Sequence, residues 1–282
     1  MNSLTRRIAL AVVTIIAAGA GRVEAGPLDP LYLTNGDNGI AFIVQGNTVT
    51  PFSEHHQGGN GQNEYAIAVS GGTVRTLHNG NDQGSSSNLG SQYNLSGAYT
   101  GVDYPGPGTV HGYYDGTTDG THNYGANFFT GNVEQLSLSW QSPVVLFHAI
   151  SNVLGISYDA SNNSIWAAQY NSHTLTDYSL GGTVLSSFTT GVSIGFVAVD
   201  PSDGSIWVGG ISQGTLDQYS NTGTLLSAPN YAALSGQNIL GGEFSEGNAN
   251  PPVGTPEPST LVAAGLGLLF GGLALRRRRQ IA

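Results

Sequence analysis

Residues 159–186 read DASNNSIWAAQYNSHTLTDYSLGGTVLS, and residues 200–227 read DPSDGSIWVGGISQGTLDQYSNTGTLLS. Placing Asp159 on Asp200, an offset of 41, gives 13 identities in these 28 positions without a gap. The identities include a Ser-Ile-Trp triplet, a Thr-Leu pair, a Tyr-Ser pair and a late Gly-Thr pair. The two stretches are therefore copies of one structural unit, and this unit decides the fold.

Each copy contains the signals of four short strands separated by turns. One strand ends at Asp159 or Asp200, and a turn rich in Ser, Asn and Gly leads to a strand that carries Ile-Trp. A third strand follows, and after the Gly-Thr turn a last strand, led by Leu185 in the first copy, completes the unit. Four antiparallel strands in about 41 residues is the period of a β-propeller blade. The alternative is a two-repeat sandwich, which would bury Trp166 and Trp207 between two sheets.

Weaker copies of the unit extend on both sides of this pair. They comprise residues 31–52, residues 65–77 and residues 119–136, in which 119–124 echo 203–207 and 133–136 supply the third strand. A body of about 220 residues divided by this period gives about five blades. Residues 238–244 would add a strand to the blade that begins near Leu31 and would close the ring without an unpaired edge. We therefore expect an all-β fold, a β-propeller of about five four-stranded blades.

The N-terminus has the order of an export signal. Arg6 and Arg7 precede an almost unbroken apolar run from residue 8 to residue 20. Small residues then precede Gly26, which predicts a signal peptide, helical in its apolar part, that is cleaved between Ala25 and Gly26. The arginine pair leaves twin-arginine export open as an alternative to ordinary secretion.

The C-terminus has three consecutive parts. They are the triplet Pro256, Glu257 and Pro258, an apolar and glycine segment at 261–275, and the cluster Arg276, Arg277, Arg278 and Arg279. As a helix, the fifteen apolar residues would span about 22 Å, somewhat less than a hydrocarbon core of about 30 Å. The arginines favour the cytoplasmic side and leave the preceding chain outside. The alternative is a buried core helix followed by a basic tail. The chain is thus divided into a signal peptide (1–25), a propeller-like exported domain (26–250) and a transmembrane sorting segment (251–282).

This tripartite tail resembles the PEP-CTERM sorting signal. The resemblance implies recognition by exosortase, a membrane processing enzyme, and a link to the exopolysaccharide and biofilm envelopes of Gram-negative bacteria. Thr255 stands where that family often has Val. The repeat over residues 152–227 resembles the blades of NHL-type and virginiamycin-B-lyase-like propellers, in which an aspartate closes one strand and an aromatic residue lies on the next. Propellers host lyases, lactonases, ligand binders and adhesion modules, so this second resemblance implies a fold and no single activity.

The exported body is strongly acidic and almost without basic residues. Of the 18 acidic residues in the chain, all but Glu24 and Glu257 lie in the body, whereas Arg75 is its one basic residue. Nucleic acid is therefore excluded as a partner, because no basic surface exists to neutralise phosphates, and divalent cations are plausible partners. The chain has no cysteine, so no disulfide stabilises the body and its stability must come from its own core.

Candidate metal ligands occur at two places. Glu54-His55-His56 combines carboxylate and imidazole groups, but Pro51 and the following glycines predict a solvated loop. Asp115 and Asp119 lie in a glycine-rich segment whose oxygen atoms suit calcium, although the spacing is not that of an EF-hand. Calcium bound by these two aspartates is the one cofactor that we retain as a possibility. No nucleophile motif or phosphate loop is present, so no catalytic residue is predicted.

The residues of the repeat are expected to be structural. An aspartate that ends a strand can accept N–H groups of the following turn, which is the role we expect for Asp159 and Asp200. Trp166 and Trp207 could stack on a sugar ring, but equivalent aromatic residues of successive blades more often pack between the sheets. We expect packing.

Two functions remain. The first is an exported protein, anchored by its C-terminus with the body outside, then processed and placed on the cell surface or in the extracellular matrix, where it has a non-catalytic binding or structural role. Its partners would be an exosortase, the membrane and polysaccharide or other matrix components. The second is a metal-dependent lyase or lactonase acting at the central channel. Its ligands would come from a set of six residues: Glu54, His55, Asp115, Asp119, Asp159 and Asp200.

Overall fold

The protein is described here by a computed structural model that covers residues 25–55, 63–78, 89–107 and 112–245. The predicted signal peptide up to residue 24 and the tail with Pro256, Glu257, Pro258 and Arg276 to Arg279 lie outside these residues. Within the described part, the only helical element is one 3₁₀ turn, η1 (Ala232–Leu234). That part also contains no helix long and apolar enough to cross a membrane.

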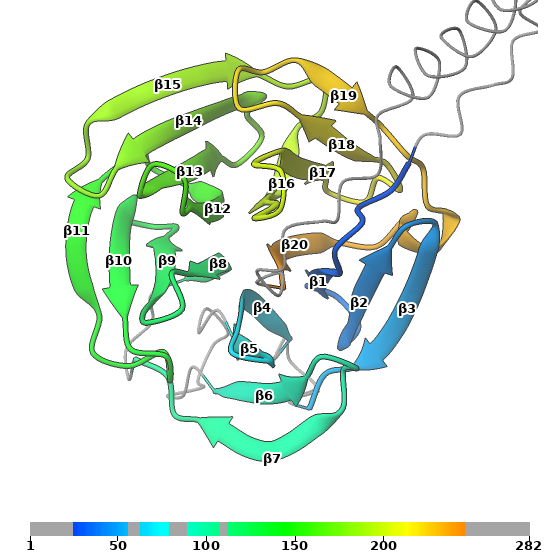
Figure 1. The fold of residues 1–282 in the computed structure, drawn as a ribbon. Helices are drawn as coiled ribbons and strands as arrows, with labels where there is room; N and C mark the ends of the chain where they lie inside the picture. Colours follow the sequence, from blue (N-terminus) through cyan, green and yellow to red (C-terminus); the bar gives the residue numbers. More distant parts are fainter. Residues whose placement is uncertain (1–24, 56–62, 79–88, 108–111, 246–282) are drawn as a thin grey trace, which may run out of the picture.

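Five four-stranded antiparallel sheets are arranged as a ring, which confirms the predicted propeller of about five blades (Figure 1). From the axis outward, the first blade is β20 (Ile239–Phe244), β1 (Leu31–Asn35), β2 (Ile40–Gln45) and β3 (Thr48–Ser53). The second is β4 (Glu64–Ser70), β5 (Thr73–His78), β6 (Gly90–Asn94) and β7 (Tyr99–Tyr104). The third is β8 (Tyr113–Thr118), β9 (Asn123–Asn127), β10 (Asn132–Leu136) and β11 (Val144–His148).

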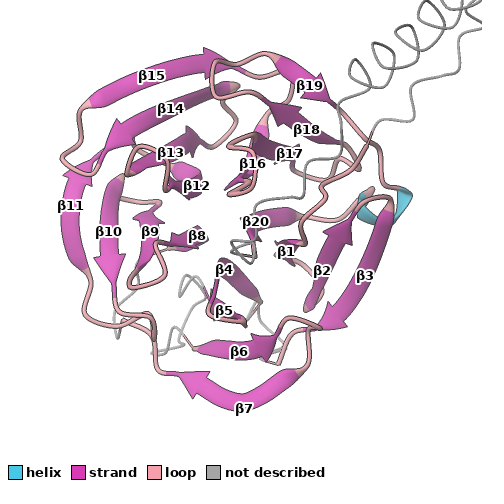
Figure 2. Ribbon diagram, in the orientation of Figure 1, coloured by secondary structure: helices cyan, strands magenta, loops and turns pink. Residues whose placement is uncertain are grey.

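The remaining two blades are the copies from which the repeat was recognised. The fourth is β12 (Val153–Asp159), β13 (Ser164–Gln169), β14 (Thr174–Ser179) and β15 (Val184–Thr189). The fifth is β16 (Ile194–Val199), β17 (Ile206–Gly210), β18 (Leu216–Tyr219) and β19 (Leu225–Ser227). Strand follows strand outward in each, as the repeat predicts, and Figure 2 shows that the ring is built of strands and loops.

The ring is closed by the last strand of the body. β20 pairs with β1 in antiparallel register, from Leu31 opposite Phe244 to Asn35 opposite Ile239. The first blade is thus assembled from both ends of the chain, and in Figure 1 the orange β20 lies beside the blue β1. This confirms the prediction that residues 238–244 close the ring. It leaves no blade without its innermost strand.

The core lies between neighbouring blades. Trp166 and Trp207 are each 1% exposed, so the prediction that they pack rather than stack on a sugar is confirmed. Trp166 packs among residues of the fifth blade such as Val197, and Trp207 packs against Phe244 of the first blade. Each tryptophan therefore fills the space between its own blade and the next. Large buried aromatic surfaces of this kind stabilise a fold that has no disulfide.

The Gly-Thr turn that both copies of the repeat contain packs against the preceding blade. Gly182 and Gly223 have φ of 82° and 84°, a region that favours glycine. A Cβ at either glycine would lie 2.7 Å from Phe147 or 2.6 Å from Phe188, which belong to the outermost strand of the preceding blade. The glycine is thus needed both for the turn and for the close approach of the aromatic ring.

One detail of the weaker copies was wrong. Asp119 does not correspond to Asp203; it follows β8 directly and comes one residue after Thr118, which occupies the position of Asp159 and Asp200 at the ends of β12 and β16. The Asp-Gly dipeptide misled the comparison, because in the fifth blade it falls late in the turn and in the third blade it begins the turn.

Candidate functional site

The axis of the ring is filled by one carboxyl group, that of Asp115 on β8. Its Oδ1 accepts N–H groups from Gly116 and Gly242, both at 2.9 Å. Its Oδ2 accepts N–H groups from Ile156 at 3.0 Å and Val197 at 3.2 Å. Asp115 is 1% exposed. One side chain therefore joins the innermost strands of four of the five blades.

Two of the four partners of Asp115 are its own repeat equivalents. Ile156 and Val197 lie 41 and 82 residues after Asp115, so they occupy the same position in the fourth and fifth blades. Burial raises the pKa of the Asp115 carboxyl, and the four N–H groups act in the opposite direction. Innermost strands expose an unpaired edge toward the axis, and this carboxyl supplies the acceptors that their N–H groups lack.

A second set of hydrogen bonds joins innermost strands in the same way, closer to the end of the channel. Thr117 Oγ1 accepts the N–H of Tyr158 at 2.9 Å, and Ser157 Oγ accepts the N–H of Val199 at 2.9 Å. Each bond again joins one innermost strand to the next. The axis thus contains a polar seam that joins β8, β12, β16 and β20.

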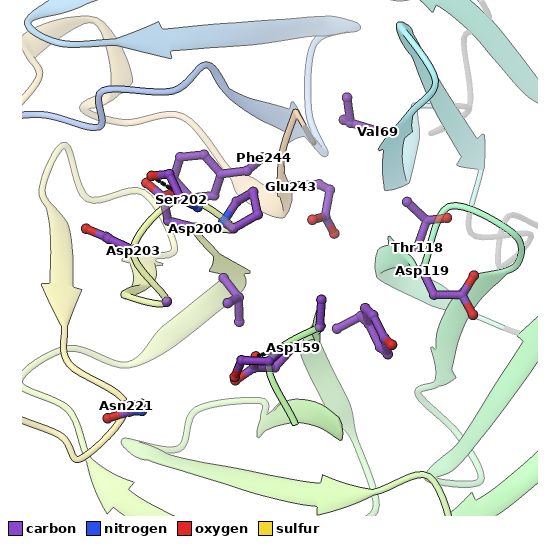
Figure 3. Close-up of a pocket in the computed structure, with 16 residues that line it drawn as sticks. Val69, Thr118, Asp119, Asp159, Asp200, Ser202, Asp203, Asn221, Glu243 and Phe244 are labelled. Carbon is purple, nitrogen blue, oxygen red and sulfur yellow. Dashed lines mark hydrogen bonds between the residues drawn. The ribbon is translucent and has the colours of Figure 1, made fainter. Parts of the chain in front are cut away.

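Above this seam lies a cavity of about 400 Å³, shown in Figure 3. It is built by the C-terminal ends of all five innermost strands and the turns after them. Its lining includes five acidic residues and no basic one: Asp119, Asp159, Asp200, Asp203 and Glu243. We call this cavity the mouth pocket. It is an acidic pocket, and the hydrogen-bonded seam that contains Asp115 lies beneath it.

Four of the five acids are fixed by their own turns. Oδ1 of Asp119, Asp159, Asp200 and Asp203 accepts the N–H of the residue two positions later, at 2.7, 2.9, 2.9 and 2.8 Å. This confirms the structural role predicted for Asp159 and Asp200. The second oxygen is engaged as well in two blades, where Tyr124 donates to Asp119 at 2.6 Å and Trp166 to Asp159 at 3.4 Å.

The surroundings of Asp119 and Asp200 shift the pKa of these two acids in opposite directions. Partial burial raises the pKa of Asp119, but bonds from Tyr124, Thr121 and His122 outweigh it and lower that pKa to about 2. Burial raises the pKa of Asp200, and the Ser202 hydroxyl and N–H partly offset this. In Figure 3 the Asp119 carboxylate points away from the opening, whereas Glu243 points into it.

Glu54 and His55 lie at the other end of the ring. Glu54 follows β3, and its Oε2 accepts the N–H of Glu64, the first residue of β4, at 3.0 Å. His55 stacks on Tyr99 with the ring centroids 3.7 Å apart. His56 lies outside the described residues. The strand β4 runs from Glu64 toward the mouth pocket at Val69, so these two residues are separated from the pocket by the length of a strand.

The residues predicted as metal ligands are therefore divided among three places. Asp115 is on the axis, Asp119 is in the turn after β8, and Glu54 with His55 is at the opposite end. Asp115 already accepts four hydrogen bonds, and Asp119 is bonded within its turn. Among the described residues, no group of three or more His, Asp or Glu side chains is placed to hold a metal ion. Calcium at Asp115 and Asp119 stays a prediction without a converging ligand set.

The axial role of Asp115 was missed at the level of sequence, although a signal was present. The repeat places Ile156 and Val197 at the equivalent positions, so Asp115 is a carboxylate where two other blades have an apolar residue. Such a substitution in an innermost strand marks a position where the pseudo-symmetry of the ring is broken.

The arrangement of five four-stranded sheets around one axis defines the chain as a five-bladed β-propeller. Its C-terminal residues 255–279 match the family model described as the PEP-CTERM protein-sorting motif, which contains Pro256, Glu257, Pro258 and the four arginines. The protein is thus a propeller that carries a PEP-CTERM sorting tail. A search of curated proteins finds no match.

Several solved structures share the fold. The chain resembles one chain in the crystal structure of the nidogen/laminin complex with a TM-score of 0.52 and 9% identity, over 77% of this chain and 98% of that one. It also resembles a streptogramin B lyase (TM-score 0.42, 16% identity, 70% of this chain) and virginiamycin B lyase from Staphylococcus aureus (TM-score 0.42, 17% identity, 62% of this chain). It spans 58% of the length of each lyase chain. At these identities the likeness concerns the fold alone.

Proposed function

We propose that this chain is an exported protein that is held at the membrane by its C-terminal tail, processed there, and then displayed on the cell surface or in the extracellular matrix. In this role the propeller is a non-catalytic binding or structural module. The observation that carries the proposal is the sorting motif at 255–279, joined to a body whose ring is closed by its own last strand. The processing enzyme is of the exosortase type.

The charge of the body limits the ligands that it can bind. The mouth pocket presents five acidic residues without a basic one, so anionic ligands are repelled there. Hydroxyl-rich and cationic groups are compatible with carboxylate acceptors. Polysaccharide and other matrix components are therefore the ligand classes that we propose, together with divalent cations as bridging ions.

Mass spectrometry of the mature C-terminus in the native host tests the sorting step. We expect the protein to lose Arg276 to Arg279 in the strain that contains the exosortase and to keep them in a strain without it. The variant Pro256→Ala should keep its arginines in both strains, because the motif is damaged and the body is not. An intact arginine cluster of the wild-type chain in both strains would contradict processing.

The second candidate is a metal-dependent lyase or lactonase at the channel. It is favoured by one observation: Asp119, Asp159 and Asp200 come from three blades to one pocket. Titration of the purified protein with Ca²⁺, Mg²⁺ and Zn²⁺, followed by thermal unfolding and by turnover of lactone substrates, separates the two candidates. Metal-dependent turnover that is lost in the double variant Asp159→Asn and Asp200→Asn would favour the enzyme. The absence of turnover with each of these metals, whether or not the metal raises the unfolding temperature, is the result that the first candidate predicts.

A further inference from the structure

Two buried glutamates meet between the first and second blades, at the end of the ring opposite the mouth pocket. Glu54 follows β3 of the first blade, and Glu64 is the first residue of β4 in the second blade. The Glu54 side chain reaches across the boundary, since its Oε2 accepts the N–H of Glu64 at 3.0 Å. The two residues are 2% and 0% exposed. A pair of carboxyl groups is therefore enclosed where two neighbouring blades of the ring meet (Figure 1).

Each of these carboxyl groups has one oxygen that accepts hydrogen bonds and one that does not. Glu64 Oε2 accepts the hydroxyl groups of Tyr93 and Thr76, both at 2.6 Å. The Tyr93 hydroxyl in turn accepts the N–H of His55 at 2.6 Å. In the described part of the chain, Oε1 of Glu54 and Oε1 of Glu64 are buried and have no hydrogen-bond partner. A carboxylate can accept bonds at both oxygens, so one buried oxygen of each glutamate is left for another ligand.

No lysine or arginine among the described residues balances the charge of this pair. Arg75 is the one such residue there, and its guanidinium donates to the carbonyl and the hydroxyl of Ser70 at 3.2 and 3.0 Å. Ser70 ends β4, six residues after Glu64, which is about 20 Å along the strand. Burial of two like charges without a counter-ion is costly, so the pair needs a cation or a proton.

The two described histidines of these blades contact other groups. The ring of His55 stacks on Tyr99 with the centroids 3.7 Å apart, and its Nε2 lies 3.9 Å from Asp103. The ring of His78 packs edge-on against Tyr65. Among the residues that the structure describes, neither histidine joins the two glutamates in a group of three metal-binding side chains. The ion that suits the pair is therefore one that accepts oxygen ligands alone.

We propose that Glu54 and Glu64 hold a calcium ion between the first and second blades, and that this ion strengthens the ring. The two Oε1 atoms are its carboxylate ligands, and backbone carbonyl groups and water complete the set of about six to eight oxygen atoms that calcium takes. One divalent cation neutralises both glutamates, whereas one shared proton would leave a negative charge buried. Magnesium suits the pair less well, because it requires near-octahedral geometry and gives up its water reluctantly. The site does not depend on the role proposed above.

Thermal unfolding of the purified full-length protein at about pH 8, first in chelator and then with increasing Ca²⁺ or Mg²⁺, tests the site. Weak extracellular calcium sites have dissociation constants of about 0.1–1 mM. Calcium at about 10 mM should therefore raise the unfolding temperature of the wild type by about 3–10 °C. Magnesium should raise it less.

Three variants locate the ion. Glu54→Gln and Glu64→Gln each remove one carboxylate ligand and should lose most of the calcium-dependent shift. Asp37→Asn is the matched control, because Asp37 is exposed at the same end of the ring and its removal changes the net charge equally. It should keep the shift. In chelator, Glu54→Gln should be more stable than the wild type, because it removes a buried charge, and calcium should cancel this advantage.

An unfolding temperature of the wild type that does not change with calcium overturns the site. If that temperature rises instead as the pH is lowered, the pair shares a proton. A calcium-dependent shift that is equal in the wild type and Glu54→Gln also overturns the site, because the ion then binds elsewhere. Glu54→Gln decides the outcome alone if Glu64→Gln does not fold, since only Glu64 accepts the Tyr93 and Thr76 hydroxyl groups.

Discussion

Asp115 on the axis can be compared with Glu54 and Glu64 at the far end of the ring. All three carboxyl groups are buried, but they differ in how many hydrogen-bond donors surround them. On the axis, both oxygens of Asp115 are saturated by four N–H groups. At the far end of the ring, Glu54 and Glu64 are 2% and 0% exposed, and Oε1 of each has no hydrogen-bond partner. The comparison teaches that backbone donors can offset part of the cost of burying a carboxyl group. Where they are too few, a buried acid weakens the fold.

Removing the axial carboxyl should have the largest effect. Asp115→Ala leaves N–H groups of four strands buried without an acceptor, and each such group costs about 1–3 kcal/mol. We expect a loss of at least about 4 kcal/mol in the free energy of unfolding, measured by urea denaturation. Asp115→Asn should also destabilise the protein, because its amide group would face two N–H donors.

The matched control for this variant is Ser157→Ala, which removes a single acceptor of the same seam. Ser157 is fully buried, and its Oγ accepts the Val199 N–H. Its loss should cost about 1 kcal/mol. Equal losses in Asp115→Ala and Ser157→Ala would refute the view that one carboxyl joins four blades.

At the far end of the ring, removing the charge of a buried acid should increase the stability of the protein, whereas removing Asp115 should decrease it. Burial, followed by the Glu64 carboxylate, raises the pKa of Glu54 well above its usual value, and the Glu64 and Asn35 N–H groups offset this only in part. Because the folded-state pKa is raised, the stability that this group contributes is fully present below about pH 4.5 and is lost as the pH rises toward the folded-state value. Glu54→Gln removes the ionisation and should stabilise the protein at pH 8 by at least about 1 kcal/mol.

Thermal unfolding of the wild type and Glu54→Gln between about pH 4 and pH 8 measures this gain. The difference between the two proteins should be small at the acidic limit and should grow with pH. Asp37→Asn is the control, because Asp37 is exposed and its removal changes the net charge by the same amount. A gain in stability that is equal in both variants would be a general charge effect and would contradict the local explanation.

The same contrast explains which features were predictable from sequence. The 41-residue repeat predicted the blades, the ring closure, the turn role of Asp159 and the packing of Trp166, because each is local or recurs at a fixed period. The axis was not predicted, since Asp115 meets Val197 only when the ring closes. For the mouth pocket, the sequence raised only the hypothesis that acidic residues from several blades meet at the central channel. Whether several acids converge there depends on how innermost strands from different blades meet, which no single blade encodes.

The smallest effect should appear at the pocket rim, where Asp119 is bonded but partly exposed. Hydrogen bonds outweigh partial burial and lower its pKa to about 2, so its stabilising contribution is present above about pH 4 and is lost as the pH falls toward 2. Asp119→Asn cannot accept the Tyr124 hydroxyl and the turn N–H groups in the same way, and solvent screening limits the loss to about 0.5 kcal/mol. Urea denaturation at about pH 5 and about pH 2.5 should show this difference shrinking in acid, because the wild type then loses the ionised group too. If the difference in the free energy of unfolding is the same at both pH values, Asp119 stabilises its turn through its shape alone and not through its charge. The rim would then differ from the axis in kind, since no carboxylate charge would be needed to hold its turn.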